Sequence, residues 1–179
     1  MPEALKYSRY SAAVISLLAC LSGQAFALSV TKTEGQTCYE YPSCKCADVT
    51  FSDSFTIREI LFCRRDGGLK MPLAFSEKGR GYADVRVLSG KTAEEIFNAV
   101  TSGRTAKKSG AVSWRVLNVR RYSAKGPHAA TVTLSADKAL AVDFQVWRRD
   151  GKTSVSAPAV FSWTAPDTAT ENMIKAAAK

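Results

Sequence analysis

Apolar and polar residues alternate along most of the chain after residue 112, a pattern typical of strands with one buried face. The strands are expected at residues 112–122, 128–135, 139–148 and from Val155 to Trp163. Short connections join them, and Asp150-Gly151 is a strong hairpin signal, so successive strands should pair antiparallel. The pattern therefore predicts a four-stranded meander over residues 112–163 with a single apolar face.

A shorter segment ahead of the meander has the spacing of an amphipathic helix. Its apolar positions are Ala93, Ile96, Phe97 and Val100. Thr92 and Glu95 fit a capping box at its start, and Gly103 fits its end. A lone helix of this length is marginal in water, so we expect it to lie across the apolar face of the meander, against residues such as Leu134 and Phe144.

The first half of the chain is less regular. Residues 28–47 hold three of the cysteines and show little periodicity, which predicts a disulfide-stapled loop. Residues 55–65 fit either a helix or a strand, and the turn residues Asp66-Gly67-Gly68 with a return segment over 69–75 favour the strand. Residues 82–88 alternate as a half-buried strand does.

These segments predict an α+β fold, namely a single small domain in which one amphipathic helix covers an antiparallel β-meander, with a disulfide-stapled N-terminal loop. The exported domain is expected over residues 28–166, followed by a C-terminal helix or tail over residues 167–179. Residues 1–27 are set apart as a signal peptide because their pattern differs from that of the rest of the chain.

The first 27 residues have the three parts of a bacterial signal sequence in order. Lys6 and Arg9 make the start positive, and Ser11–Leu21 is an uncharged apolar run too short to span a bilayer. Ala25-Phe26-Ala27 supplies the small residues of a cleavage site. Cleavage after Ala27 would release a periplasmic or secreted protein of about 150 residues, enough for one domain.

A second processing route is open at Cys20. The segment Leu17-Leu18-Ala19-Cys20 resembles the lipobox of bacterial lipoproteins, although leucine at position 18 is less usual there. The resemblance implies that Cys20 would be lipidated and would anchor the protein in the envelope. The complete cleavage site that follows the apolar run favours the first route.

Four cysteines follow the signal sequence: Cys38, Cys44, Cys46 and Cys63. An even number in an exported chain predicts two disulfides. A bridge between Cys44 and Cys46 would close a strained ring, so Cys38 should pair with one of these two and Cys63 with the other. The spacing lacks the paired knuckles of a zinc site, and no metal is expected.

The chain is basic, with a formal net charge of +9 at pH 7. The candidate anion-binding residues are Arg64, Arg65, Lys107, Lys108, Arg120, Arg121, Arg148 and Arg149. They could gather into one patch at the hairpin ends, but successive strand residues point to opposite faces, so each pair could also divide. This charge allows two interpretations, an anionic partner or a basic surface of exposed, solvated side chains that serves solubility alone. For a partner we expect a protein or an anionic envelope component rather than nucleic acid, and a membrane only if Cys20 is lipidated.

No catalytic motif stands out, and we assign neither a catalytic residue nor a cofactor. His128 is the single histidine, and its place after Gly126-Pro127 suits a turn better than catalysis. These features predict a non-enzymatic exported protein that binds a macromolecular, anionic partner. The alternative is an envelope hydrolase that acts on a glycan or another anionic substrate through carboxylates, with Asp143, Glu59 and Asp84 as first candidates.

Overall fold

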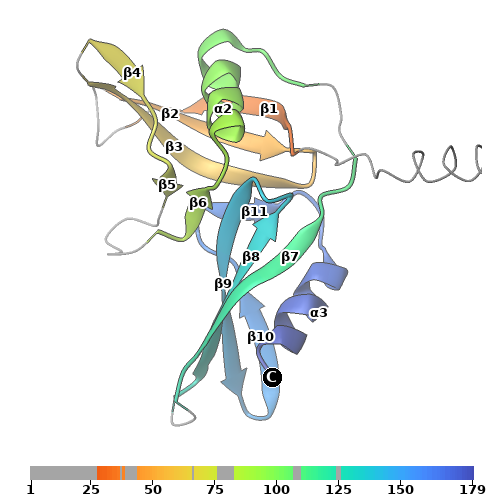
Figure 1. Ribbon diagram of the computed structural model, residues 1–179. Helices are drawn as coiled ribbons and strands as arrows, with labels where there is room; N and C mark the ends of the chain where they lie inside the picture. Colours follow the sequence, from red (N-terminus) through yellow and green to blue (C-terminus); the bar gives the residue numbers. More distant parts are fainter. Residues whose placement is uncertain are drawn as a thin grey trace, which may run out of the picture.

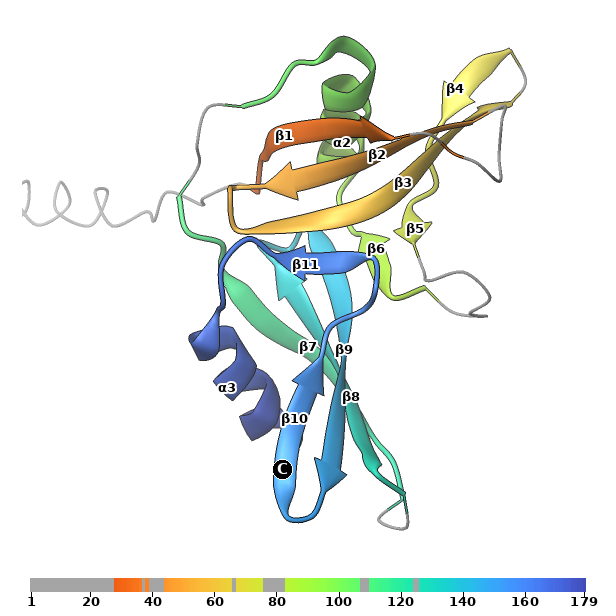
Figure 2. The same cartoon turned by 180° about the vertical axis from the view of Figure 1, so that it is seen from behind.

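The computed structural model describes residues 28–36, 38, 44–65, 67–75, 83–106, 110–123 and 126–179. They form two antiparallel β-sheets and two helices, so the chain is a small α+β domain (Figure 1). In both views the strands of the first sheet run steeply across those of the second, which extends well beyond it (Figures 1 and 2). No helix within the described ranges is long and apolar enough to cross a membrane.

The first sheet has the strand order β1-β2-β3-β11. Its strands are β1 (Val30–Gln36), β2 (Cys44–Phe51), β3 (Phe55–Arg65) and β11 (Phe161–Trp163), and the short β4 (Gly68–Lys70) pairs with the end of β3. A bulge interrupts β3 at Glu59, which has a positive φ and donates its backbone N–H to Asp48 Oδ1 at 2.9 Å. The bulge allows Ile57 and Ile60 both to be buried.

The second sheet has the order β5-β6-β9-β8-β7. Its strands are β5 (Ala74–Phe75), β6 (Val85–Val87), β7 (Trp114–Arg121), β8 (His128–Ala136), β9 (Leu140–Arg149) and β10 (Lys152–Ser156), which pairs with β9. Asp150 and Gly151 form the predicted β9–β10 turn, with the positive φ angles that such a turn requires. The meander is therefore confirmed from Trp114 to Ser156.

The apolar faces of the two sheets meet in one core. An aromatic cluster joins them, made of Phe55 and Phe161 from the first sheet and Trp114 and Phe144 from the second, with Trp163 beside them. The ring of Phe144 lies 5.4 Å from that of Phe161 and 6.4 Å from that of Trp114, between centroids. As the alternation predicted, Phe144 is buried, whereas its neighbour Asp143 points to the other face.

Helix α2 (Gly90–Ser102) does not cover the meander, so the predicted docking is wrong. It lies against β1 and β2 of the first sheet and also contacts β6 (Figure 1). Glu95 Oε1 accepts the backbone N–H of Val30 at 2.8 Å, and the rings of Phe97 and Phe62 are 6.3 Å apart. The cap is Ser89 rather than Thr92, which leaves Glu95 free for this contact.

Helix α3 (Thr168–Ala177) and the first sheet cover the apolar face of the meander instead. Asp167 caps the helix, since its Oδ1 accepts the backbone N–H of Thr170 at 2.9 Å. At the other end Arg121 and Arg148 donate to the carbonyl oxygens of Ala177 and Ala178, at 3.1 and 3.3 Å. Cations at this end are favoured because the last helical carbonyls carry partial negative charge.

The last predicted strand is broken in two, because Pro158 cannot donate a ladder hydrogen bond. Its carbonyl accepts the N–H of Phe161 at 2.9 Å, and Arg58 donates its N–H to Val160 O at 2.8 Å. The chain thus leaves the second sheet after Ser156 and completes the first one as β11. The predicted N-terminal loop needs a similar correction, because residues 30–36 form strand β1.

The two disulfides join Cys38 to Cys46 and Cys44 to Cys63, with Cα–Cα distances of 5.5 and 4.2 Å. Cys44 and Cys63 are directly opposite each other on β2 and β3. Register therefore selects between the two pairings that the sequence left open. The bridge Cys44–Cys63 fastens two paired strands, whereas Cys38–Cys46 ties the segment after β1 to β2. Two disulfides are typical of a protein outside the cytoplasm.

Candidate functional site

The second sheet turns one face away from the core, and we call this side its outer face. Strand alternation and cross-strand register place the following residues on it: Arg86, Asn118, Arg120, Tyr122, His128, Thr131, Thr133, Asp143, Gln145, Trp147, Arg149 and Lys152. Both helices lie elsewhere, since α2 contacts the first sheet and β6, and α3 packs on the apolar side. The outer face thus combines aromatic, amide, hydroxyl and guanidinium groups.

Three rings stand side by side at the far end of this face. His128 lies between Tyr122 and Trp147, with ring centroids 4.4 and 4.6 Å away and interplanar angles of 30° and 26°. These separations match the spacing of neighbouring strands, which is about 4.8 Å. Because the residues belong to or follow β7, β8 and β9, the rings stand upright on adjacent strands as one stack.

A row of hydrogen bonds fixes the stack to the sheet. The hydroxyl groups of Tyr122 and Thr131 are 3.1 Å apart, and Thr131 donates to Gln145 Oε1 at 2.9 Å. His128 Nε2 is buried in the stack without a hydrogen-bond partner among the described residues. At Nε2 the imidazole is therefore in contact with rings rather than with a polar partner.

Carboxylates on this side of the sheet are already engaged. Asp143 forms a two-point ion pair with Arg86, with N–O distances of 2.8 and 3.2 Å, and accepts the hydroxyl of Thr133 at 2.7 Å. The ion pair raises the pKa of Arg86 above its usual value, mainly through the hydrogen bonds to Asp143. Asp84 is buried beside β6, and Glu59 lies at the bulge of the other sheet. The structure places Asp84 next to Asp143, whose backbone N–H donates to the carbonyl oxygen of Asp84 at 2.9 Å, and both charges act on Arg86. Glu59, in the other sheet, is apart from them.

The adjacent arginine pairs divide between the two faces. Arg121 and Arg148 point to the apolar side and hold the end of α3, whereas Arg120 and Arg149 are exposed on the outer face. Lys152 lies directly opposite Arg149 on β10 and adds a third cation. Arg64 is exposed at the end of β3 in the first sheet, and the side chain of Arg65 and both Lys107 and Lys108 lie outside the described part of the chain.

Sequence reasoning did not find the ring stack. Tyr122, His128 and Trp147 are spread over 26 positions, and only the β7–β8–β9 register brings them together. A bulge between His128 and Ala130 complicates that register further. The sequence did offer one indication of the stack, because each of the three residues lies at or next to one end of a predicted strand.

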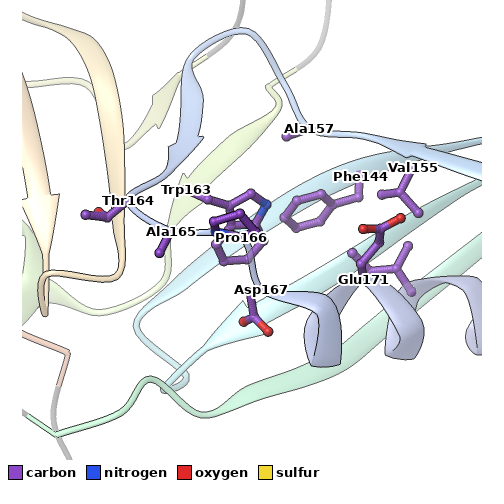
Figure 3. A pocket seen from close by; sticks show the side chains of 10 residues that line it. Phe144, Val155, Ala157, Trp163, Thr164, Ala165, Pro166, Asp167 and Glu171 are labelled. Carbon is purple, nitrogen blue, oxygen red and sulfur yellow. The ribbon is translucent and has the colours of Figure 1, made fainter.

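A cavity of about 420 Å³ lies between α3 and the end of the core (Figure 3). Its floor includes Phe144 and Trp163, and Glu171 reaches toward them from α3. Its two carboxylates are already used, because Asp167 caps α3 and Glu171 pairs with Lys175 at 2.6 Å. The described ranges contain no group of three or more His, Cys, Asp or Glu residues that could hold a metal ion.

No family model matches the chain, and neither a curated protein nor a solved structure does. The function of the protein is therefore inferred from the geometry of the outer face.

Proposed function

We propose that this is an exported protein, periplasmic or secreted, that binds an anionic macromolecule through the outer face of its second sheet. The observation that carries the proposal is the placement of Arg120, Arg149 and Lys152 around the Tyr122–His128–Trp147 stack. The signal-type N-terminus and the two disulfides support export.

The outer face suits binding better than catalysis because its charge is one-sided where it is exposed. Asp143 is neutralised by Arg86, while Arg120, Arg149 and Lys152 form no ion pair among the described residues and outnumber the one exposed carboxylate near them, Asp150 in the β9–β10 turn. Positive charge on a rigid surface attracts anions over several ångströms and raises association rates. The ring stack supplies a fixed apolar body between these charges, with its positive ring edges available to an anion.

Ser154 leaves one face of the Trp147 indole open for a ligand. It lies directly across from Trp147 on β10, while His128 occupies the other side of the indole. Because serine is small, the second face of the indole has no bulky cross-strand neighbour. A planar or ring-shaped group of the ligand could therefore stack there, close to Lys152.

The test compares two variants that remove the same charge. Arg120, Arg149 and Lys152 are changed to Gln in one, and the exposed Lys45, Arg58 and Lys91 are changed to Gln in the other. Binding to dextran sulfate, with neutral dextran as reference, should weaken about tenfold in the first variant and less than about threefold in the second. Equal losses would show a diffuse charge effect, and no binding of dextran sulfate by the native protein would overturn the proposal.

A further inference from the structure

Strand β7 is an open edge of the second sheet. In the described part of the chain β8 is the only strand that pairs with it, so the opposite backbone edge has no strand partner. Within β7 every residue from Arg115 to Arg121 is exposed except the half-buried Val119. An edge of this length offers N–H and C=O groups to any extended segment that can approach it.

Exposed apolar side chains concentrate on the same strand. Among the described residues five large apolar side chains are exposed, and three of them belong to β7 or follow it directly. These are Val116, Leu117 and Tyr122, whose exposed fractions are 40%, 54% and 40%. Tyr122 belongs to the ring stack, whereas Val116 and Leu117 are adjacent on the open edge and offer apolar contacts to a segment that docks there.

The charge of β7 selects the partner. The strand carries Arg115, Arg120 and Arg121 and no carboxylate. Antiparallel pairing with a second copy about its centre would set Arg115 opposite Arg120 or Arg121, and like charges in such positions are destabilising. The bulge at Leu117 further discourages unselective pairing. An acidic segment would meet none of this repulsion.

We propose that β7 receives an extended acidic segment of a partner protein as an added strand. Backbone hydrogen bonds would supply affinity, carboxylates of the segment would lie near Arg115 and Arg120, and its apolar residues would cover Val116 and Leu117. This inference deepens the proposed function and rests on it, because it makes the anionic macromolecule a protein. Arg120 belongs both to the outer face and to this edge, so a docked strand would continue the same surface.

The probe is a short peptide of alternating Glu and Val, and its control is a peptide of equal charge in which Pro replaces each Val. Proline removes every second backbone donor and leaves only the Glu N–H groups for pairing, so it weakens strand addition without changing charge. The Glu–Val peptide should bind at least about tenfold more tightly by NMR titration, and amide hydrogen exchange should slow within residues 115–121. Leu117→Glu should weaken binding about tenfold, and Leu73→Glu, at an equally exposed leucine elsewhere, should not.

The outcomes separate this inference from the proposed function. Equal binding of both peptides without slower exchange in β7 would overturn strand addition and leave the charged outer face standing. Binding of dextran sulfate with no binding of either peptide would likewise overturn it and point to a non-protein anion. Failure of dextran sulfate and both peptides would remove both proposals.

Discussion

The two sheets share one core but are secured differently away from it. Two disulfides fasten the first sheet, one of them directly across β2 and β3. In the second sheet side chains perform that task, through the Arg86–Asp143–Thr133 group and the ring stack around His128. The covalent solution needs only cysteines, whereas the second one places charged and aromatic groups on the surface. The proposed binding face therefore lies on the sheet without disulfides.

A change in the shared core should destabilise both sheets equally, although disulfides stabilise one and side-chain contacts the other. Phe144→Ala is expected to lower the free energy of unfolding by about 3–5 kcal/mol, because the buried ring touches aromatic residues of both sheets. Urea unfolding followed by tryptophan fluorescence and by circular dichroism should still give coincident transitions. A mutant in which one sheet melts before the other would contradict a single core.

Removing the bridge Cys44–Cys63 tests the covalent half of the comparison. Changing both cysteines to Ala should cost about 3 kcal/mol, since the bridge spans 19 residues and restricts the unfolded chain. The double change at Cys38 and Cys46, whose bridge spans 8 residues, is the control and should cost about 2.5 kcal/mol. Urea titrations measure both. A loss confined to the second sheet would contradict the assignment of these bridges.

Arg86→Met tests the ion pair with Asp143, which stabilises the second sheet without a disulfide. Asp143 would keep only Thr133 as a partner in a partly buried position, so we expect a loss of about 1.5–3 kcal/mol. Asp143→Asn in the same background should restore part of the stability, because it removes the unpaired charge. Thermal melts of the two variants provide the comparison. An unchanged melting temperature in Arg86→Met would show that the ion pair does not stabilise the second sheet.

The smallest effect is expected at the β8–β9 turn, and it has a favourable sign. Burial raises the pKa of Asp137, although its Oδ1 accepts the N–H of Ser113 at 3.0 Å. A raised pKa means that Asp137 favours folding at acidic pH and loses that contribution as the pH rises through the folded value. Asp137→Asn, which keeps the acceptor and suits the positive φ, should therefore gain less than about 1 kcal/mol at pH 7. The gain should shrink below about pH 4, and a gain independent of pH would contradict the burial argument.

Local patterns predicted local structure well. The strands β7 to β9, the Asp150-Gly151 turn and the helix that ends at Gly103 all follow from residues close together in the chain. Docking of that helix depends on β1, whose mostly polar sequence gave no strand signal. A polar edge strand needs few apolar residues, and its pairing partner identifies it better than its own pattern does.

The candidate site was harder to predict than the fold. The division of Arg120 from Arg121 and of Arg148 from Arg149 follows from strand alternation, which the sequence allowed as one of two arrangements. The ring stack depends on three strands in register, including one bulge, so no single segment contains its signal. Likewise, the pairing of Cys44 with Cys63 becomes evident only when β2 and β3 are aligned.

The position of β11 has a consequence for the order in which the chain can assemble. The β2–β3 hairpin and both cysteine pairs lie within residues 38–65, so oxidation can proceed on a growing chain. The strand that covers the outer edge of β3 does not arrive until residues 161–163, long after β3 itself has been made. Until then a disulfide-fixed hairpin presents an unpaired edge to its surroundings, which is a hazard for aggregation. Truncations that stop before Phe161 should therefore be oxidised but prone to associate.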